Sequence, residues 1–467
     1  MLFNSLNFFY FFTVVLLLYF SIPFKWKWLL LLLASCYFYM FFIPVYILVL
    51  FFTIVVDYFA GIWMEEAKDE KRKKTFLTLS IISNVGILVF FKYYAFLNDN
   101  LTAWLSFANI KNEIPYLNII LPIGLSFHTF QAMSYNFEIY KGNQKAEKHL
   151  GYYALYVLYF PQLVAGPIER PQNVLPQFHQ NHKWNSDRCL HGLQLIIYGL
   201  FKKVVVADRL ALLVDPVFNH YENVSGADLI FATFLFSFQI FCDFSGYSDI
   251  AIGSSKILGI ELMKNFDKPY FASSISSFWR KWHISLSTWF RDYVYIPLGG
   301  SKTKTWLHVR NLLIIFLLSG LWHGANWTFI VWGGIHALYI VMEKVIKKLT
   351  SYLKKLGPII EMVLFNPIVT FVMVSFAWIF FRANTLEESF NIIVKCTHLS
   401  DASLSFINFY SLIAIALIAL LLVFDKWLNL YETRLRDKKE FFFLLFMLLT
   451  ICTLGISENE QFIYFQF

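Results

Sequence analysis

Long apolar runs, separated by short connectors that carry most of the charge, set the pattern of this chain. The first four runs cover residues 8–22, 28–42, 46–64 and 76–91. Later runs cover 118–137, 152–164, 190–206, 229–244, 311–342, 363–381, 409–424 and 441–456. Helical runs of this length reach across most or all of a bilayer, and a soluble protein with one anchor would show a single one. The pattern predicts an all-α, polytopic integral membrane protein.

The connectors predict which side of the membrane they face. Lys25 and Lys27 follow the first run, and residues 68–74 supply a dense basic cluster. By the positive-inside rule both connectors are cytoplasmic, so the N-terminus and the tail at Glu458 are expected outside. The weakly charged segment 92–117 is expected to be an extracytoplasmic loop.

The run 311–342 is long for one span and has basic residues at both ends. Arg310 precedes it and Lys344 follows it. One straight helix would place one of these cations outside the cell. A bent or re-entrant pair of helices, broken near Gly320 and Gly324, keeps both in the cytoplasm. We predict the broken pair.

Composition narrows the class of protein further. Hydrophobic residues make up 58% of the 467 residues and charged residues 15%, which is far outside soluble composition. The net charge of +8 comes from basic connectors of the kind that face anionic lipid, and no basic stripe suited to nucleic acid occurs. Five cysteines are scattered singly, so neither a metal site nor a disulfide framework is expected.

His323 is the foremost candidate for chemistry. It lies in an apolar run, with Gly320 three residues before it and Gly324 directly after it. Small neighbours let another backbone or a thin substrate approach the imidazole, and ionisable groups at membrane depth usually act on something. A histidine shielded from water can be neutral at physiological pH, as a general base must be. A structural histidine that ties helices together is the alternative, and the local pattern leaves both open.

Three more histidines are of interest. His283 follows alternating aromatic and basic residues, 279–282, as in an interfacial helix, so it either supports chemistry or simply meets water at headgroup level. His128 is expected to be bonded inside the helix bundle. On one ideal helix His336 would lie about 220° round from His323 and share no face with it.

Polar residues also gather in two other places. The loop 299–304, Gly-Gly-Ser-Lys-Thr-Lys, can hold phosphate through backbone N–H groups and lysines, although it has no P-loop spacing. Adjacent Arg291 and Asp292 are expected to pair elsewhere. Asp243, Tyr247 and Asp249 follow an apolar run. Their segment either orients a histidine, lines a polar funnel or caps a helix, for which Ser248 and Asp249 are competent.

A series of motifs carries a resemblance that covers nearly the whole chain. The series is 121–124 (LPIG), 160–168 (FPQLVAGPI), 243–249 (DFSGYSD), 265–270 (NFDKPY), 278–289 (FWRKWHISLSTW), 320–325 (GLWHGA) and 462–465 (FIYF). In this order and spacing it resembles the membrane-bound O-acyltransferase (MBOAT) family, most closely the bacterial alginate and peptidoglycan O-acetyltransferase membrane subunits. A sister branch transfers D-alanine to teichoic acids. His128 departs from the pattern, because the family has an aromatic residue such as tyrosine there.

The resemblance implies a single membrane domain over residues 1–467. Its fold is a ring of about 10 to 12 transmembrane helices around a thin core with re-entrant or broken helices. The N-terminal spans cover 1–150, the catalytic core 151–345 and the C-terminal spans 346–467. His323 matches the family's catalytic histidine, and His283 the second motif histidine beside it.

The implied reaction is transfer of an acetyl group from cytoplasmic acetyl-CoA, a co-substrate, to an extracytoplasmic glycan such as peptidoglycan or an alginate-like polysaccharide. The implied setting is a bacterial inner membrane with a periplasmic SGNH-type transferase as partner. No tightly bound cofactor, metal or nucleic acid is expected. A transporter, and D-alanyl transfer from a carrier protein, are the alternatives.

Roles for individual residues follow from that chemistry. His323 would deprotonate the acceptor hydroxyl or carry the acetyl group transiently, and His283 or Asn326 would stabilise the oxyanion. Further supporting residues are Trp322, Asp243, Tyr247 and Asp249. The basic residues Arg280, Lys281, Lys302 and Lys304 suit the phosphates of CoA.

Overall fold

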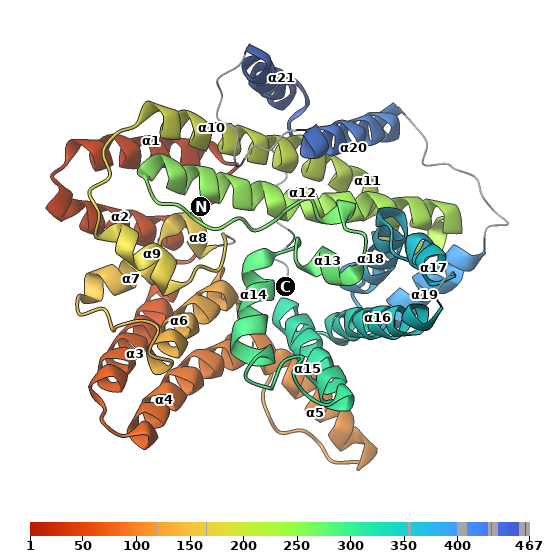
Figure 1. Cartoon of the computed structure of the whole chain (residues 1–467), viewed down its shortest axis with the longest axis horizontal. Helices are drawn as coiled ribbons and strands as arrows, with labels where there is room; N and C mark the ends of the chain where they lie inside the picture. Colours follow the sequence, from red (N-terminus) through yellow and green to blue (C-terminus); the bar gives the residue numbers. More distant parts are fainter. Residues whose placement is uncertain are drawn as a thin grey trace. The chain divides into compact units, whose positions relative to one another are not determined.

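The chain is helical throughout the part that the structure describes. This computed structural model describes residues 1–117, 119–164, 166–353, 356–398, 409–427, 431, 438–456 and 463. Within those ranges every regular element is a helix (Figure 1), as the apolar pattern predicts. The tail motif 462–465, apart from Ile463, and the predicted outer position of Glu458 lie outside the described residues.

Two compact units make up the chain. The first comprises Met1–Leu193 and Ala251–Met263, and the second Gln194–Ile250 and Lys264–Phe467. Two long helices, α10 (Ser186–Leu200) and α12 (Gly226–Leu258), contribute residues to both units. The expected divisions of the membrane domain at 150 and 345 stay predictions.

The first unit is built from short and medium helices. They are α1 (Leu6–Ser21), α2 (Phe24–Met40), α3 (Ile47–Glu66), α4 (Glu70–Leu88), α5 (Tyr94–Phe107), α6 (Leu125–Tyr140), α7 (Leu150–Leu158), α8 (Phe160–Leu163) and α9 (Pro171–Phe178). Helices α3, α4 and α6 pack against one another. Their contact buries Asp57, which accepts hydrogen bonds from Asn84 at 2.8 Å and from Asn136 at 2.9 Å. Such bonds between helices hold membrane bundles together.

Two predictions fall in this unit. His128 is buried and its Nε2 lies 2.6 Å from the Thr53 hydroxyl, so it is bonded inside the bundle as predicted. The expected loop at 92–117 is wrong in its first half, because α4 continues through a π-helical segment (Val89–Tyr93) into α5. Asn98 on α5 is buried and accepts a hydrogen bond from Asn112 at 2.7 Å. This bond ties the following segment back to the helix, and low charge alone did not reveal it.

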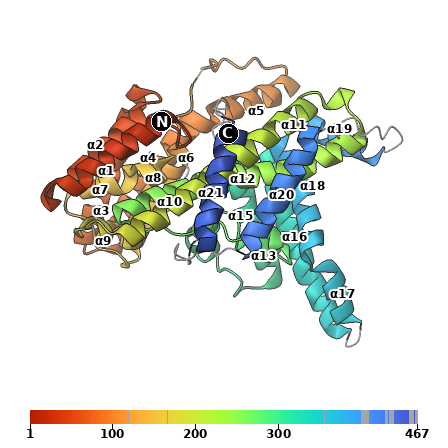
Figure 2. The ribbon, with the colours of Figure 1, turned by 90° about the horizontal axis from the view of Figure 1, so that it is seen from above.

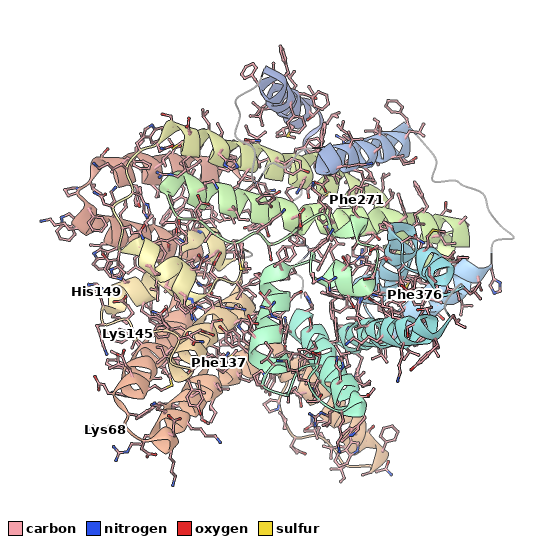
Figure 3. All side chains as sticks on the ribbon, in the orientation of Figure 1. Lys68, Phe137, Lys145, His149, Phe271 and Phe376 are labelled. Carbon is pink, nitrogen blue, oxygen red and sulfur yellow. The ribbon has the colours of Figure 1, made fainter. Side chains whose placement is uncertain are left out.

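The basic cluster 68–74 lies where α3 ends and α4 begins. Asp69 caps α4 by accepting a hydrogen bond from the Lys71 N–H at 2.8 Å. Figure 3 shows Lys68 at the end of this helix pair, pointing away from it. The cytoplasmic position of this turn stays a prediction.

Glu169, in the proline-broken segment after α8, is a buried carboxyl outside the candidate spans. It accepts hydrogen bonds from the Met263 N–H and from Asn173 Nδ2. Burial raises the pKa of Glu169 to about 7, although these bonds oppose the shift. The folded state therefore holds a proton that the unfolded state releases, and stability falls as the pH rises from the ordinary value near 4.5 to about 7.

Glu169→Gln is expected to stabilise the protein at pH 8 but not at pH 4. Glutamine stays neutral, so at pH 8 it avoids a cost of about 3 kcal/mol, from ~1.4 kcal/mol per pKa unit. Thermal unfolding of the detergent-solubilised protein at both pH values measures this difference. An equal shift in midpoint at both pH values would contradict it.

The second unit holds the remaining helices. After π-helical η3 (Phe201–Ala207) come α11 (Asp208–Asn219), α13 (Ile275–Trp279), α14 (Ile284–Phe290), π-helical η6 (Arg291–Tyr295), α15 (Thr305–His323), α16 (Trp327–Tyr352), α17 (Gly357–Leu364), α18 (Pro367–Arg382), α19 (Leu386–Thr397), α20 (Phe409–Trp427) and α21 (Lys438–Leu454). Figures 1 and 2 show α16, α17 and α18 close together, and α16 contacts both of the others.

The run 311–342 is a broken helix pair, as predicted. Helices α15 and α16 form an antiparallel hairpin whose turn begins at Gly324. Glycines let the two backbones meet: a Cβ at Gly320 would lie 2.2 Å from the Phe329 carbonyl oxygen, and one at Gly333 2.2 Å from that of Phe316. His308 and Lys344, at the open end, lie 2.6 Å apart between Nε2 and Nζ. The basic flanks of the run therefore share one end of the hairpin.

Fewer helices than the predicted number are long enough to span a bilayer alone. Six described helices are long and apolar enough, or seven if α17 and α18, bent by 50° at a short break, form one span. Two shorter apolar helices, α1 and α21, add to these. Proline and glycine break several of the apolar runs, so run length overstates helix length. The multi-pass character is clear, and the ring around a thin core stays a prediction.

Candidate active site

His323 lies at the tip of the α15–α16 hairpin. It is the last residue of α15, where Gly324 takes an extended conformation and ends the helix. Its side chain is buried, and its ring centroid lies 5.1 Å from Trp332 and 5.5 Å from Phe381. Both neighbours meet the imidazole at steep angles, 90° and 69°. The histidine thus lies in an aromatic box, formed by Trp332 and Phe381, that keeps bulk water away.

The turn places His336 beside the same box, contrary to the single-helix expectation. His323 ends α15 and His336 belongs to α16, so the angle around one ideal helix does not apply. The Trp332 ring lies 5.1 Å from each of the two histidine rings. Trp332 therefore stands between them.

Asn326 caps α16 at the same turn. Its Oδ1 accepts a hydrogen bond from the Thr328 N–H at 3.1 Å, and its Nδ2 donates to the Asn384 carbonyl at 2.7 Å. Both ends of the amide are therefore engaged in holding the turn. The geometry assigns Asn326 to shaping the hairpin tip. To stabilise an oxyanion as predicted, its Nδ2 would have to give up the hydrogen bond to the Asn384 carbonyl.

His283 is completely buried between α13 and α14. The interpretation that it meets water at an interface is wrong. Its backbone has φ of 43°, in the left-handed region that a β-carbon disfavours, and such strain often occurs at functional sites. Burial lowers the pKa of His283 to about 3, so its ring is neutral at physiological pH.

Asn265 determines which nitrogen of His283 carries the proton. The Ser285 N–H donates to Asn265 Oδ1 at 3.3 Å, which identifies that atom as the oxygen. His283 Nδ1 lies 3.1 Å from the same oxygen, so Nδ1 donates and Nε2 holds the lone pair. Asn265 Nδ2 donates in turn to the Ser248 hydroxyl at 3.1 Å. Asn265 lies in a motif noted in the sequence, but its role was missed because it depends on contacts between segments.

Trp322 brings the two histidine motifs together. Its ring centroid lies 6.1 Å from that of His283 and 4.9 Å from that of its chain neighbour His323. The side chain is buried. His283 and His323 therefore lie on either side of one indole that contacts both rings.

The aspartates of the 243–249 motif neutralise buried lysines. Asp243 accepts from Lys203 Nζ at 2.6 Å and from the Ile463 N–H at 2.8 Å. Asp249 accepts from Lys202 Nζ at 2.8 Å. These pairs are buried, and removing one partner would leave an uncompensated charge.

The structure bears on two of the three interpretations of this motif, and the polar funnel stays a prediction. Helix capping by Ser248 or Asp249 is wrong, because both lie inside the continuous helix α12. The motif does orient a histidine, through Ser248 and Asn265 rather than through the aspartates. Phe244 packs on the His283 ring at 4.7 Å, and Tyr247 is buried on the same helix.

A pocket of about 640 Å³ lies beside the hairpin. Along α15 it is lined by Leu312, Phe316 and Ser319, which recur at helical spacing on one face. The next position on that face, one turn after Ser319, is His323. Lys344 of α16 and Arg280 line the pocket and are exposed.

The structure separates the predicted donor-binding cations. Arg280 lines the pocket, whereas Lys281, Lys302 and Lys304 do not; only Ser301 of the glycine loop does. Arg291 is a further lining cation, and it pairs with its neighbour Asp292 at 2.7 Å rather than elsewhere.

Comparison with known families identifies the protein class. A model of the membrane-bound O-acyltransferase family matches residues 141–383, just over half of the chain, including both histidines. The chain belongs to this family. This acyltransferase is 37% identical over 349 residues to a probable alginate O-acetylase of Azotobacter vinelandii, covering 74% of this chain and 68% of that protein.

Two further relatives, one of each branch, are similar to the acyltransferase to different degrees. The peptidoglycan O-acetyltransferase of Helicobacter pylori is 35% identical over 409 residues, covering 80% of this chain and 76% of that protein. The teichoic acid D-alanyltransferase of Bacillus subtilis is 27% identical over 299 residues, covering 61% and 74% respectively. The acyltransferase is more similar to these O-acetylases than to this D-alanyltransferase.

Proposed function

We propose that this acyltransferase takes an acetyl group from acetyl-CoA in the cytoplasm and delivers it across a bacterial inner membrane for O-acetylation of a glycan. Peptidoglycan and an alginate-like polysaccharide are the proposed acceptors, by analogy with the named relatives. One observation carries the proposal: a pocket with cations among its lining ends one helical turn before His323. A thioester with a phosphorylated arm suits that shape and charge.

The proposed reaction joins the acceptor oxygen to the acetyl carbon at His323. The imidazole takes the proton of the acceptor hydroxyl, and the oxygen attacks the thioester carbonyl. The carbon–sulfur bond then breaks, and the leaving thiolate receives the proton from the imidazolium. The products are an acetyl ester and free CoA thiol. His283, neutral and held with Nδ1–H toward Asn265, presents Nε2 as a lone pair and so can accept, but not donate, a hydrogen bond there.

This tautomer changes the proposed role of His283. An oxyanion needs a donor, and a neutral Nε2 without a proton cannot be one. His283 instead suits the holding of a hydroxyl or a water near Trp322. A periplasmic transferase of the SGNH type remains the proposed recipient of the acetyl group, since the chain offers no serine nucleophile elbow of its own.

Thioester turnover by purified protein in lipid vesicles tests the proposal. Acetyl-CoA is supplied on one side, and a soluble glycan oligomer with an SGNH-type transferase on the other. Free thiol and acetylated oligomer are measured. Release of both products in the wild type, and of neither in His323→Ala, is expected. A transporter would cleave no thioester. Turnover only with a D-alanyl carrier protein would favour the reaction of the more distant relatives.

Charge reversal at the pocket distinguishes two donor sites. Arg280→Glu, combined with Lys344→Glu, is expected to raise KM for acetyl-CoA about tenfold or more with little change in kcat, because the phosphates are remote from the reacting carbonyl. The matched pair Lys302→Glu and Lys304→Glu tests the loop predicted from the sequence. Both effects should shrink at high salt, since these side chains are exposed. A larger KM effect from the loop pair would move the donor phosphates to that loop.

A further inference from the structure

The indole of Trp279 forms the wall of the pocket that faces the aromatic box. Trp279 lines the pocket, and its ring centroid lies 5.3 Å from Phe316 and 5.7 Å from Trp332. Trp332 in turn contacts His323 at 5.1 Å. Trp279 and Trp332 therefore form a chain of ring contacts from the pocket wall to the histidine.

His336 contacts this indole through a hydrogen bond and through ring packing. Trp279 Nε1 donates to His336 Nδ1 at 3.3 Å, and the ring centroids lie 5.0 Å apart. Because indole can only donate, Nδ1 carries the lone pair and the His336 proton is on Nε2. His336 is completely buried, and its Nε2 has no hydrogen-bond partner among the described residues.

A leucine would fill this buried position without placing a polar ring there, so packing alone does not account for a histidine. Among the described residues, the hydrogen bond that its ring makes is the one that Trp279 donates from the pocket wall. Its position on α16 supports the same role, since Trp332, His336, Ile340 and Lys344 form one helical stripe from the box to the rim.

We propose that Trp279 limits the length of the acyl group that this enzyme transfers, and that His336 is the positioning residue that keeps the indole in place. The inference rests on the proposed function, in which the acyl end of the donor lies between the pocket and His323. An acetyl group adds one methyl to the reacting carbonyl. A longer chain must displace an indole that is packed against Phe316 and Trp332, and overpacking of this kind is unfavourable.

A series of acyl-CoA donors tests the inference. Thiol release is measured in vesicles with acetyl-, butyryl- and octanoyl-CoA, and the ratio of kcat/KM for butyryl over acetyl is the readout. Trp279→Ala is expected to raise this ratio about tenfold or more, since a single methylene in an apolar pocket is worth about 10- to 200-fold. Trp279→Phe keeps an aromatic ring at the wall but loses the N–H and part of the fused ring, so it should raise the ratio less than Trp279→Ala does.

Variants of His336 separate positioning from packing. His336→Leu removes the acceptor and should raise the ratio by less than Trp279→Ala, because the indole keeps its bulk. Combining it with Trp279→Phe should change the ratio little beyond Trp279→Phe alone, because both substitutions remove the same hydrogen bond. His336→Asn places an amide oxygen near the Nδ1 position and should restore the wild-type ratio. A purely structural role would lower expression or overall rate and leave the ratio unchanged.

The outcomes distinguish this inference from the proposed function. If the wild type turns over acetyl-CoA while folded Trp279→Phe and His336→Leu keep its donor ratio, the wall does not set chain length and the inference is wrong. If the wild type cleaves none of the three donors, the proposed acyl-CoA function fails and the inference falls with it. A raised ratio in Trp279→Phe that His336→Asn does not share supports both residues' roles.

Discussion

His323→Ala is expected to abolish glycan acetylation while the protein still inserts and folds. The imidazole lies in ring contact with both Trp332 and Phe381, where it is shielded from bulk water. Loss of a positioned general base typically slows a reaction by about 10²–10⁴-fold. Acetyl release from the isolated glycan, measured against the amount of folded protein in the membrane, gives the result.

A matched histidine controls for folding. His128 is also buried and bonded to a helix neighbour, but it belongs to the first unit and not to the box. His128→Gln is therefore expected to lower stability and to keep acetylation per folded molecule near that of the wild type. Near-normal acetyl content in His323→Ala would show that this histidine is structural, and the hairpin tip would lose its proposed role.

Asn265→Leu is expected to reduce turnover about tenfold or more through His283. The substitution removes the acceptor of the Nδ1–H, and loss of one buried hydrogen bond costs about 1–3 kcal/mol. His283 can then shift its proton to Nε2 and turn the opposite nitrogen toward the site. Asn265→Asp keeps an acceptor at the same distance and should retain more activity than Asn265→Leu.

The pH profile distinguishes orientation from simple destabilisation. The pKa of His283 is lowered to about 3 by burial, below its ordinary value of 6.5. Its neutral form therefore contributes stability above pH 6.5 that is lost as the pH falls toward 3. A new carboxylate beside the ring in Asn265→Asp favours the protonated ring, so the acid limb of the rate profile should move upward. An unmoved acid limb would show that His283 does not take part in the step.

The sequence predicts the helices and the hairpin break well, because a bilayer requires apolar helical spans and keeps basic flanking residues on one side. The run 311–342 carries cations at both ends and glycines between them, and these features suffice to predict the turn near His323. The segment 92–117 lacks such signals. The residues after its helix are held by the bond between Asn98 and Asn112, which no periodicity reports.

The candidate site is predictable only in part, because its parts come from separate segments. His283 and His323 can be singled out by their setting in the chain, but the burial of His283 depends on its packing against Phe244 and its bond to Asn265. The same holds for Asp249, which meets Lys202 from another helix. Partners of this kind are fixed by tertiary contact, and one sequence holds no direct record of them.

The hairpin of α15 and α16 also sets a length scale for the proposed donor. A β-carbon at Gly320 or Gly333 would clash with the facing backbone, so the two helices are in direct backbone contact. Lys344 at the pocket and Trp332 at the box lie on the same helix, α16, which separates them by ~18 Å at 1.5 Å per residue. A small thioester could not touch both ends at once. Only a donor that carries its sulfur on a long, extended arm can keep its charge at the rim while its acyl carbon reaches the histidine.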